Sequence, residues 1–185
     1  MEDSKHRSVV EELYKQIMTA GDQWDEVVST YHDYFDFVYK DVLNMLGETA
    51  LHLAVSHGPE NSVEQLVAII SKKQEFKEAL AIKNKEGNTP LHLAATTGSL
   101  RKCICIAEAN PSLGNARNNT GESPLFLAAL HGKTDIFVCL RYICQRYLDN
   151  SYYRKVGGET ILHCAIKRQC WGEHFYLLKV TLPNK

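Results

Sequence analysis

The apolar residues of this 185-residue chain recur at offsets of three and four within short segments that are themselves repeated. The clearest sets are Leu51, Ala54 and Val55; Leu91, Ala94 and Ala95; and Leu125, Ala128 and Ala129. Offsets of three and four place residues on one face of an α-helix, so each segment is predicted to be a helix with one apolar stripe. The small alanines favour the close approach of a neighbouring helix.

Four similar phrases contain or match these stripes. They are GETALHLAVSHG, GNTPLHLAATTG, GESPLFLAALHG and GETILHCAIKRQ, which begin at Gly47, Gly87, Gly121 and Gly158 and are therefore 40, 34 and 37 residues apart. The leading glycine suits a turn that needs a positive φ, and the hydroxyl residue two positions later suits a helix N-cap. In two copies Pro90 or Pro124 then stands at the first helical position, where a missing N–H costs nothing. A turn followed by a helix is thus predicted four times.

A second helix with an apolar face is predicted after the first one in three units, at 62–71, 100–109 and 134–147. A unit of helix, tight turn, helix and polar link buries its apolar face only by stacking on its neighbours. We therefore predict an all-α solenoid with short β-turn or hairpin links. Its units are 44–83, 84–117, 118–154 and a partial C-terminal unit, 155–185.

The front of the chain fits a more polar unit of the same kind. The segment from Leu13 to Tyr31 predicts a helix, a turn at Gly21 and a second helix that carries Trp24, and Gly21 lies 37 residues before Gly58, which keeps the period. An array of stacked units needs an end with a polar outer face. Residues 1–43 are therefore predicted to form an N-terminal helical capping unit.

The aromatic segment YHDYFDFVY, from Tyr31 to Tyr39, has two interpretations. It could be an exposed recognition patch, because aromatic residues are common at interface hot spots. It could instead pack the first unit against the second, because most aromatic side-chain area is buried in protein cores. The second interpretation is favoured.

The phrase GNTPLHLAATTG contains T-P-L-H-x-A, and at these residues the chain resembles the ankyrin-repeat family. The other copies depart from the pattern at single positions, such as Ala50 and Ile161 for the proline and Phe126 for the histidine. The resemblance covers roughly residues 45 to 183. It implies an ankyrin solenoid that binds proteins.

The opening from Leu13 to Val28, together with GETALH and GETILHCAI, also resembles a plant subgroup of this family. Its longer chains carry C-terminal membrane helices of the PGG-domain type, and some are linked to accelerated cell death and salt tolerance. The resemblance implies a cytosolic ankyrin region at the plasma membrane. These 185 residues contain no apolar run of about 18, the length that suggests a membrane span. We therefore expect a truncated relative or a fragment.

Composition narrows the class of protein. Apolar residues make up 44% and charged residues 23%, which is typical of a folded globular chain. Twenty-one basic and twenty-two acidic residues give a net charge of -1, and no block of five like charges occurs, which argues against a nucleic acid or an anionic membrane as partner. The charged N-terminus lacks the apolar region of a secretory signal, so a cytoplasmic location is expected.

The repeated histidines His52, His92 and His163 raise the possibility of a shared metal site. Residues in successive stacked helices lie about 10 Å apart, whereas zinc needs ligands at about 2 Å, so separate hydrogen bonds near each unit's own turn are favoured. No cofactor or metal is expected. The cysteines are Cys103, Cys105, Cys139, Cys144, Cys164 and Cys170, and they are expected to be reduced and buried. No catalytic motif or small-molecule site is found, which predicts a non-enzyme.

The predicted function is partner binding through a concave surface made of turn tips and helix ends. The residues expected to contact an unidentified protein are Lys85, Glu86, Asn88, Thr96, Thr97, Asn119, Glu122, Leu130, His131, Arg154, Lys155, Lys167 and Arg168. The resemblance extends this function to plant stress or defence signalling. The alternative is a cytosolic regulatory or oligomerisation region of a plant ankyrin membrane protein, with a channel-like role.

Overall fold

The computed structural model describes residues 2–73, 76–148, 154–155, 157–160 and 163. Within them the helices are α1 (Glu2–Thr19), α2 (Asp25–Asp33), α3 (Phe35–Val38), α4 (Ala50–His57), α5 (Glu60–Ser71), α6 (Phe76–Ala81), α7 (Pro90–Thr97), α8 (Leu100–Ala109), the 3-10 helix η1 (Pro111–Asn115), α9 (Pro124–Leu130) and α10 (Thr134–Cys144). No strand is assigned in this part of the chain, where an isolated antiparallel bridge joins Arg154 and Thr160.

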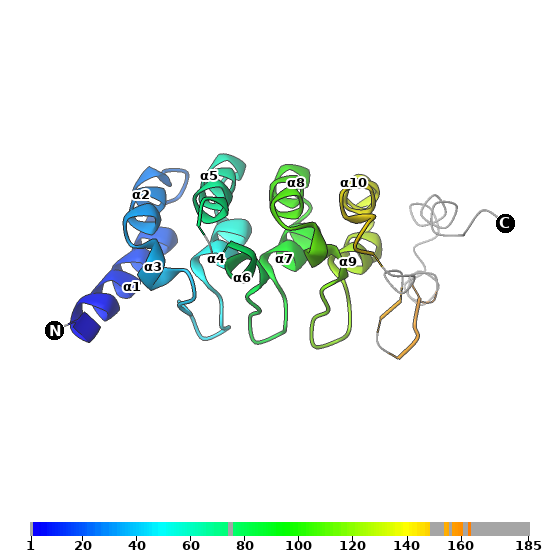
Figure 1. Cartoon of the computed structure of the whole chain (residues 1–185), viewed down its shortest axis with the longest axis horizontal. Helices are drawn as coiled ribbons and strands as arrows, with labels where there is room; N and C mark the ends of the chain where they lie inside the picture. Colours follow the sequence, from blue (N-terminus) through cyan, green and yellow to red (C-terminus); the bar gives the residue numbers. More distant parts are fainter. Residues whose placement is uncertain (1, 74–75, 149–153, 156, 161–162, 164–185) are drawn as a thin grey trace.

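The helices stand in two rows, with the links projecting on one side (Figure 1). One row runs α1, α4, α7, α9, and the other runs α2, α5, α8, α10; within each row every helix contacts the next. From α4 onward, the rows are built from helix–turn–helix pairs that contribute one helix to each row, such as α4 with α5 and α7 with α8. This arrangement confirms the predicted all-α solenoid of stacked helical units.

The first helix of each pair starts where the sequence predicts. Thr49 and Thr89 cap α4 and α7, and the Oγ of Ser123 accepts the backbone N–H of Phe126 at the start of α9. Pro90 and Pro124 are the first residues of α7 and α9. Among the second helices, α8 has the predicted bounds, α5 begins two residues earlier than predicted, and α10 ends at Cys144 instead of residue 147.

The core follows the two rows without a break between units. Ala54, Ala94 and Ala128 are fully buried on α4, α7 and α9, as expected for positions at which helices approach closely. The row of second helices contributes larger side chains, including Leu66, Ile106 and Phe137. Cys103 and Cys144 are buried free thiols, and Cys105 and Cys139 are half-buried. Cys164 and Cys170 lie outside the described residues.

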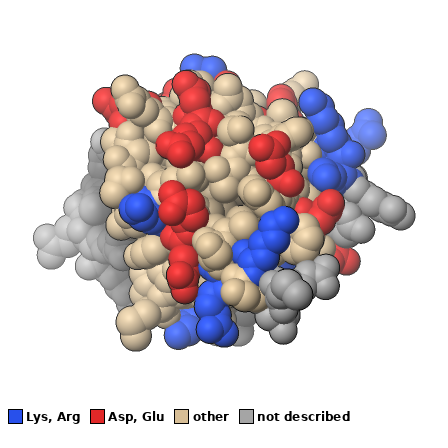
Figure 2. Space-filling view, turned by 90° about the vertical axis from the view of Figure 1, so that its left-hand side faces the viewer, with Lys and Arg blue, Asp and Glu red and all other residues tan. Residues whose placement is uncertain are grey.

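The N-terminal residues contain the predicted helix, turn and helix. Trp24 is buried just before α2, its Nε1 donates to the carbonyl of Gly21 at 3.0 Å, and its ring lies so close to Gly58 that an added Cβ there would meet it at 3.1 Å. The end of the array that α1 and α2 cover carries both basic and acidic side chains (Figure 2). This outer face is polar, as a capping unit requires.

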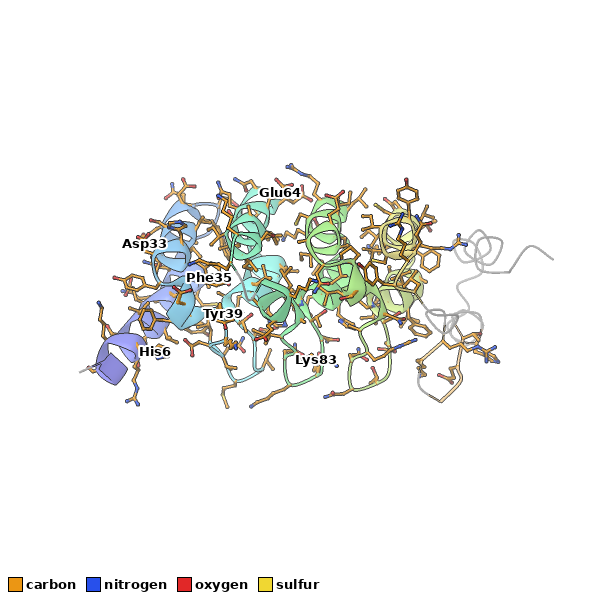
Figure 3. The ribbon with its side chains drawn as sticks, viewed as in Figure 1. His6, Asp33, Phe35, Tyr39, Glu64 and Lys83 are labelled. Atoms are coloured by element: carbon orange, nitrogen blue, oxygen red, sulfur yellow. The ribbon has the colours of Figure 1, made fainter. Side chains whose placement is uncertain are left out.

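The aromatic segment is mainly packed, which confirms the favoured interpretation. Tyr31 and Phe35 are buried with their rings edge-to-face at 5.6 Å, and Tyr39 stacks on Phe35 at 5.0 Å (Figure 3). The Nζ of Lys73 lies 5.0 Å from the centre of the Phe35 ring. Phe37 is different, because 52% of its surface is exposed.

Polar side chains of α8 also bind the preceding unit. The buried Nζ of Lys102 in α8 donates to the carbonyls of Val55 and Gly58 at 2.7 and 2.6 Å, which satisfies the C-terminal end of α4. Arg101 makes a two-point contact with Glu64 at 2.9 and 2.8 Å. Because burial disfavours a charge, the pKa of Lys102 is lowered.

Candidate partner-binding surface

The links between units form four fingers, which contain residues 43–48, 83–88, 117–122 and, of the fourth, 154–155 and 157–159 (Figure 1). In each of the first three an asparagine starts the turn, namely Asn44, Asn84 or Asn118. Its side-chain Oδ1 accepts the backbone N–H groups two and four residues later, at 2.9 to 3.1 Å. A glycine with φ of 76° or 77° closes these turns. The asparagine and the glycine thus fix the finger, and the two residues between them form its tip.

Adjacent fingers are joined by their backbones. The N–H of Lys85 donates to the carbonyl of Leu46 at 2.9 Å, and the N–H of Asn119 donates to the carbonyl of Glu86 at 3.0 Å. The side chain of Lys83, labelled in Figure 3, donates from Nζ to the carbonyl of Arg117 at 2.7 Å. Arg117 in turn donates to the carbonyl of Arg154 in the fourth finger. The fingers therefore form one connected edge of the molecule.

The repeated histidines connect one unit to the next. Nδ1 of His52 accepts the N–H of Thr49 at 3.3 Å, so the ring proton is on Nε2, which donates to the carbonyl of Asn88 at 3.0 Å. His92 repeats this arrangement with Thr89 at 3.1 Å and the carbonyl of Glu122 at 3.1 Å. The first contact confirms the predicted hydrogen bond near the histidine's own turn. The second reaches the following finger, which the sequence analysis did not foresee.

Burial keeps these imidazoles neutral. It lowers the pKa of His52 and lowers the pKa of His92 to about 4. Both ring nitrogens of each are already used by the protein. Across the described part of the chain, no three His, Cys, Asp or Glu side chains are grouped so that they could hold a metal ion.

Most of the sequence-predicted contact residues that the structure describes lie at the surface. Lys85, Glu86 and Asn119 are exposed at finger tips, and Glu122 is half-buried at the base of the third finger. Arg154 is exposed in the fourth finger, where half-buried Lys155 pairs with Glu159 at 2.6 Å.

Three further candidates lie at the helix ends nearest the tight turns. Thr96 and Thr97 are exposed at the end of α7, and His131 is exposed just after α9. The structure therefore places the surface candidates in two strips, one along the fingers and one along these helix ends.

Two predicted contact residues are placed differently. Asn88 is only 8% exposed, its N–H is taken by Asn84, and its Nδ2 donates to Glu86 at 3.0 Å, so it supports the second finger. Leu130 is buried at the end of α9, where apolar packing holds it. Neither side chain offers a surface for a partner. Lys167 and Arg168 lie outside the described residues.

The sequence analysis missed the tip of the first finger. Met45 and Leu46 are 89% and 58% exposed. The equivalent tips of the second and third fingers are Lys85 with Glu86 and Asn119 with Thr120. Aligning the two residues that precede each leading glycine would have revealed this apolar pair.

Comparison with known proteins identifies the repeat. A family model described as "Ankyrin repeats (3 copies)" matches residues 4–113, which is more than half of the chain. The chain belongs to the ankyrin-repeat family. Ankyrin repeats generally mediate protein–protein interaction. The paired helices and projecting fingers described above are thus the units of an ankyrin solenoid.

Several curated ankyrin proteins are similar to this chain. The human B-cell lymphoma 3 protein is 31% identical over 129 residues, which is 67% of this chain and 26% of that protein. The mouse nuclear factor NF-kappa-B p105 subunit is 24% identical over 127 residues, 69% of this chain and 12% of that protein. The Arabidopsis thaliana E3 ubiquitin-protein ligase KEG is 30% identical over 129 residues, 68% of this chain and 7% of that protein. The ankyrin chain thus spans about a quarter or less of these relatives.

The described helices were also compared with the requirements of a membrane span. None of them combines the length and the apolar character that crossing a bilayer would need.

Proposed function

We propose that this ankyrin array is a non-catalytic scaffold that binds a partner protein along its fingers and the C-terminal ends of α7 and α9. One observation carries the proposal. The backbone groups of the fingers bind one another, while the side chains that differ between copies are exposed at the tips. A repeated frame with variable exposed positions is suited to recognising a partner.

The frame also supports tight binding for an energetic reason. A loop that becomes ordered only on binding loses conformational freedom at that moment, which weakens the complex. Here the asparagine side chains, the finger-to-finger hydrogen bonds and the histidines already hold the fingers in place. The entropy cost at the interface therefore falls mainly on the exposed side chains.

The relatives favour a regulatory partner. They include a subunit of a nuclear factor and an E3 ubiquitin-protein ligase, and this chain matches only a small part of each. We propose that this array likewise recruits a protein for regulation.

The test uses two charge-changing variants of the chain. Thr97→Glu with His131→Glu places carboxylates on the helix-end strip, and Gln65→Glu with Gln145→Glu places them at exposed positions of the opposite row. Proteins captured from cells that express the chain are quantified by mass spectrometry. We expect the first variant to lose the captured partner, and the second to retain it. The reverse result, with both variants folded by circular dichroism, would place the interface on α5 and α10.

A second candidate function rests on the motifs of the plant subgroup. The opening from Leu13 to Val28 and the phrase GETILHCAI support a role as the cytosolic regulatory region of a plant ankyrin protein anchored at the plasma membrane, in stress or defence signalling. The test is to sequence the natural transcript beyond the codon for Lys185. A reading frame that continues into apolar stretches of about 20 residues supports this role, and one that stops without them counts against it.

A further inference from the structure

The tip of the first finger differs in its chemistry from the tips of the second and third fingers. Met45 is 89% exposed and Leu46 is 58% exposed, whereas the second and third fingers present Lys85 with Glu86 and Asn119 with Thr120. Isolated surface apolar residues are common in proteins and need no explanation. Two of them side by side at the tip of a finger are a different matter, because the second and third fingers carry polar residues at both equivalent positions.

Exposed apolar side chains also occur in the chain just before the first finger. Val42, in the segment that leads into the finger, is 55% exposed. Its neighbour Asp41 binds Nε2 of His6 at 2.6 Å, and the His6 ring lies 6.2 Å from the ring of Phe37. A hollow of about 150 Å³ beside them is lined by Lys5, His6, Val9, Tyr34 and Phe37.

The fold does not need Met or Leu at this tip. The turn is held by Oδ1 of Asn44, which accepts the N–H groups of Leu46 and Glu48, and the Leu46 carbonyl binds the next finger through its backbone. The second and third fingers build the same turn and the same connection with polar tips. The methionine side chain is flexible and polarizable, which suits it to a partner surface of irregular shape.

The charged side chains near the tip indicate which charge a partner would carry beside its apolar side chain. The stem of Lys85 lies against the first finger, since a Cβ added at Gly47 would be 3.0 Å from its Cγ. Lys83 and Lys85 are both exposed, while Glu48 is buried and binds Asn44. Exposed Glu86 accepts a hydrogen bond from Asn88. No salt bridge involves Lys85 among the described residues. Lys85 therefore supplies an exposed positive charge whose stem lies against the first finger.

We propose that Met45 and Leu46 anchor a segment of a partner protein that presents an apolar side chain with an acidic side chain close to it. The apolar side chain contacts the first finger, and the acidic one pairs with Lys85. The two should be roughly one to three residues apart, since an extended residue spans about 3.3 Å and the stem of Lys85 lies on the first finger. This inference rests on the proposed protein-binding function and names the chemistry of the partner.

The experiment selects binders from a displayed library of random peptides on the intact chain. Selected peptides are then synthesised with a fluorophore and titrated by anisotropy. The key variant is Met45→Lys with Leu46→Glu, which copies the tip of the second finger and so keeps a sequence that this turn is known to accommodate. Its matched control is Gln65→Lys with Gln145→Glu, which introduces the same two residues at exposed positions of the opposite helix row.

We expect the selected peptides to share an apolar residue close to Asp or Glu. The first-finger variant should weaken binding by about tenfold or more, as for loss of a central anchor, and the control should stay within about twofold. Lys85→Gln should weaken binding about threefold at low salt and less at high salt, because screening already reduces an exposed charge pair. Circular dichroism melting checks that each variant is folded.

Other outcomes overturn the proposal. If Thr97→Glu with His131→Glu abolishes peptide binding but the first-finger variant does not, the anchor is wrong and the scaffold function stands. A library that yields no binder counts against both. Self-association in sedimentation that the first-finger variant abolishes would assign the tip to a second copy of this chain. Flotation with phosphatidylcholine and phosphatidylserine vesicles that the same variant abolishes would assign it to a lipid surface.

Discussion

At the scale of single residues, the two buried histidines hold the array together in two directions. Each imidazole accepts a hydrogen bond at the start of its own helix and donates one to the following finger. The first contact requires the neutral ring, because a protonated ring has no acceptor nitrogen, whereas either form of the ring can donate from Nε2. One ring therefore fixes the helix start through Nδ1 and contacts the next unit through Nε2. Protonation removes the first of these contacts.

Acid should weaken the fold through these histidines. Burial lowers the pKa of His92 from 6.5 to about 4 and lowers that of His52. The unfolded chain then binds more protons than the folded chain below pH 6.5, so the stability is complete above that pH and is lost as the pH falls toward 4. For His92 the loss at pH 5 is about 2 kcal/mol of unfolding free energy. Urea titrations at pH 7 and pH 5 measure it.

Substitution separates this effect from that of the carboxylates, which also titrate in acid. His92→Gln should reduce the difference between the two pH values by about the same 2 kcal/mol, because the shifted group is gone. His57→Gln is the matched control, since His57 is exposed at the end of α4. If both variants keep the pH dependence of the original chain, the buried imidazole is not its source.

At the scale of elements, the first three fingers are joined in sequence by backbone hydrogen bonds. Gly87 shows how closely they pack. Its φ is +77°, and an added Cβ would lie 2.4 Å from Oδ1 and 2.6 Å from the backbone nitrogen of Asn119 in the third finger. Glycine is therefore needed there for two independent reasons, the left-handed backbone and the contact with a neighbouring element.

Comparing two glycines separates the cost of the left-handed backbone from the cost of the contact with the neighbouring finger. Gly21 also has a positive φ of +53°, but nothing lies within 4 Å of an added Cβ. Gly21→Ala should cost only the left-handed conformation, about 1 kcal/mol. Gly87→Ala should cost about 1 to 2 kcal/mol more, because the third finger must move and its hydrogen bond from Asn119 to Glu86 is lost. Thermal unfolding gives the difference, and equal costs would mean that the fingers are not closely coupled.

Much of this element-level structure could be predicted from the sequence, for a physical reason. Helix starts depend on local chemistry, and Thr89 followed by Pro90 specifies one almost alone. Contacts between units depend on which atoms meet after stacking, so the bond from His52 to Asn88 could not be deduced from spacing. The burial of Asn88 and Leu130 was missed because repeat position does not reveal how far a side chain extends into its neighbours.

The first finger shows another limit of the sequence analysis. The repeated phrases contain the residues that the copies share, whereas Met45 and Leu46 lie just before the first phrase, at positions that vary between copies. In a solenoid the shared residues build the frame and the variable ones are available for recognition. Their exposure was decided by the turn geometry that Asn44 and Gly47 impose.

At the scale of the whole molecule, stability passes from unit to unit, because each helix row is continuous through the described residues and neighbouring pairs pack on one another. The N-terminal unit is therefore as much a part of the core as the central ones. It contributes buried Leu13, Trp24, Val27, Tyr31 and Phe35, and α1 and α2 pack on α4 and α5. Its outer face, in contrast, meets solvent.

Removing residues 1–43 should consequently do more than shorten the array. The faces of α4 and α5 that pack on α1 and α2 become exposed, so we expect hydrogen exchange in residues 50–71 to lose most of its protection while α7 to α9 keep theirs, with increased binding of a hydrophobic dye. Glu11→Gln with Glu12→Gln on the exposed side of α1 is the control, and it should change the unfolding free energy by less than about 0.5 kcal/mol. If the shortened chain protects residues 50–71 as well as the full chain does, the N-terminal unit is an accessory to the array and not its cap.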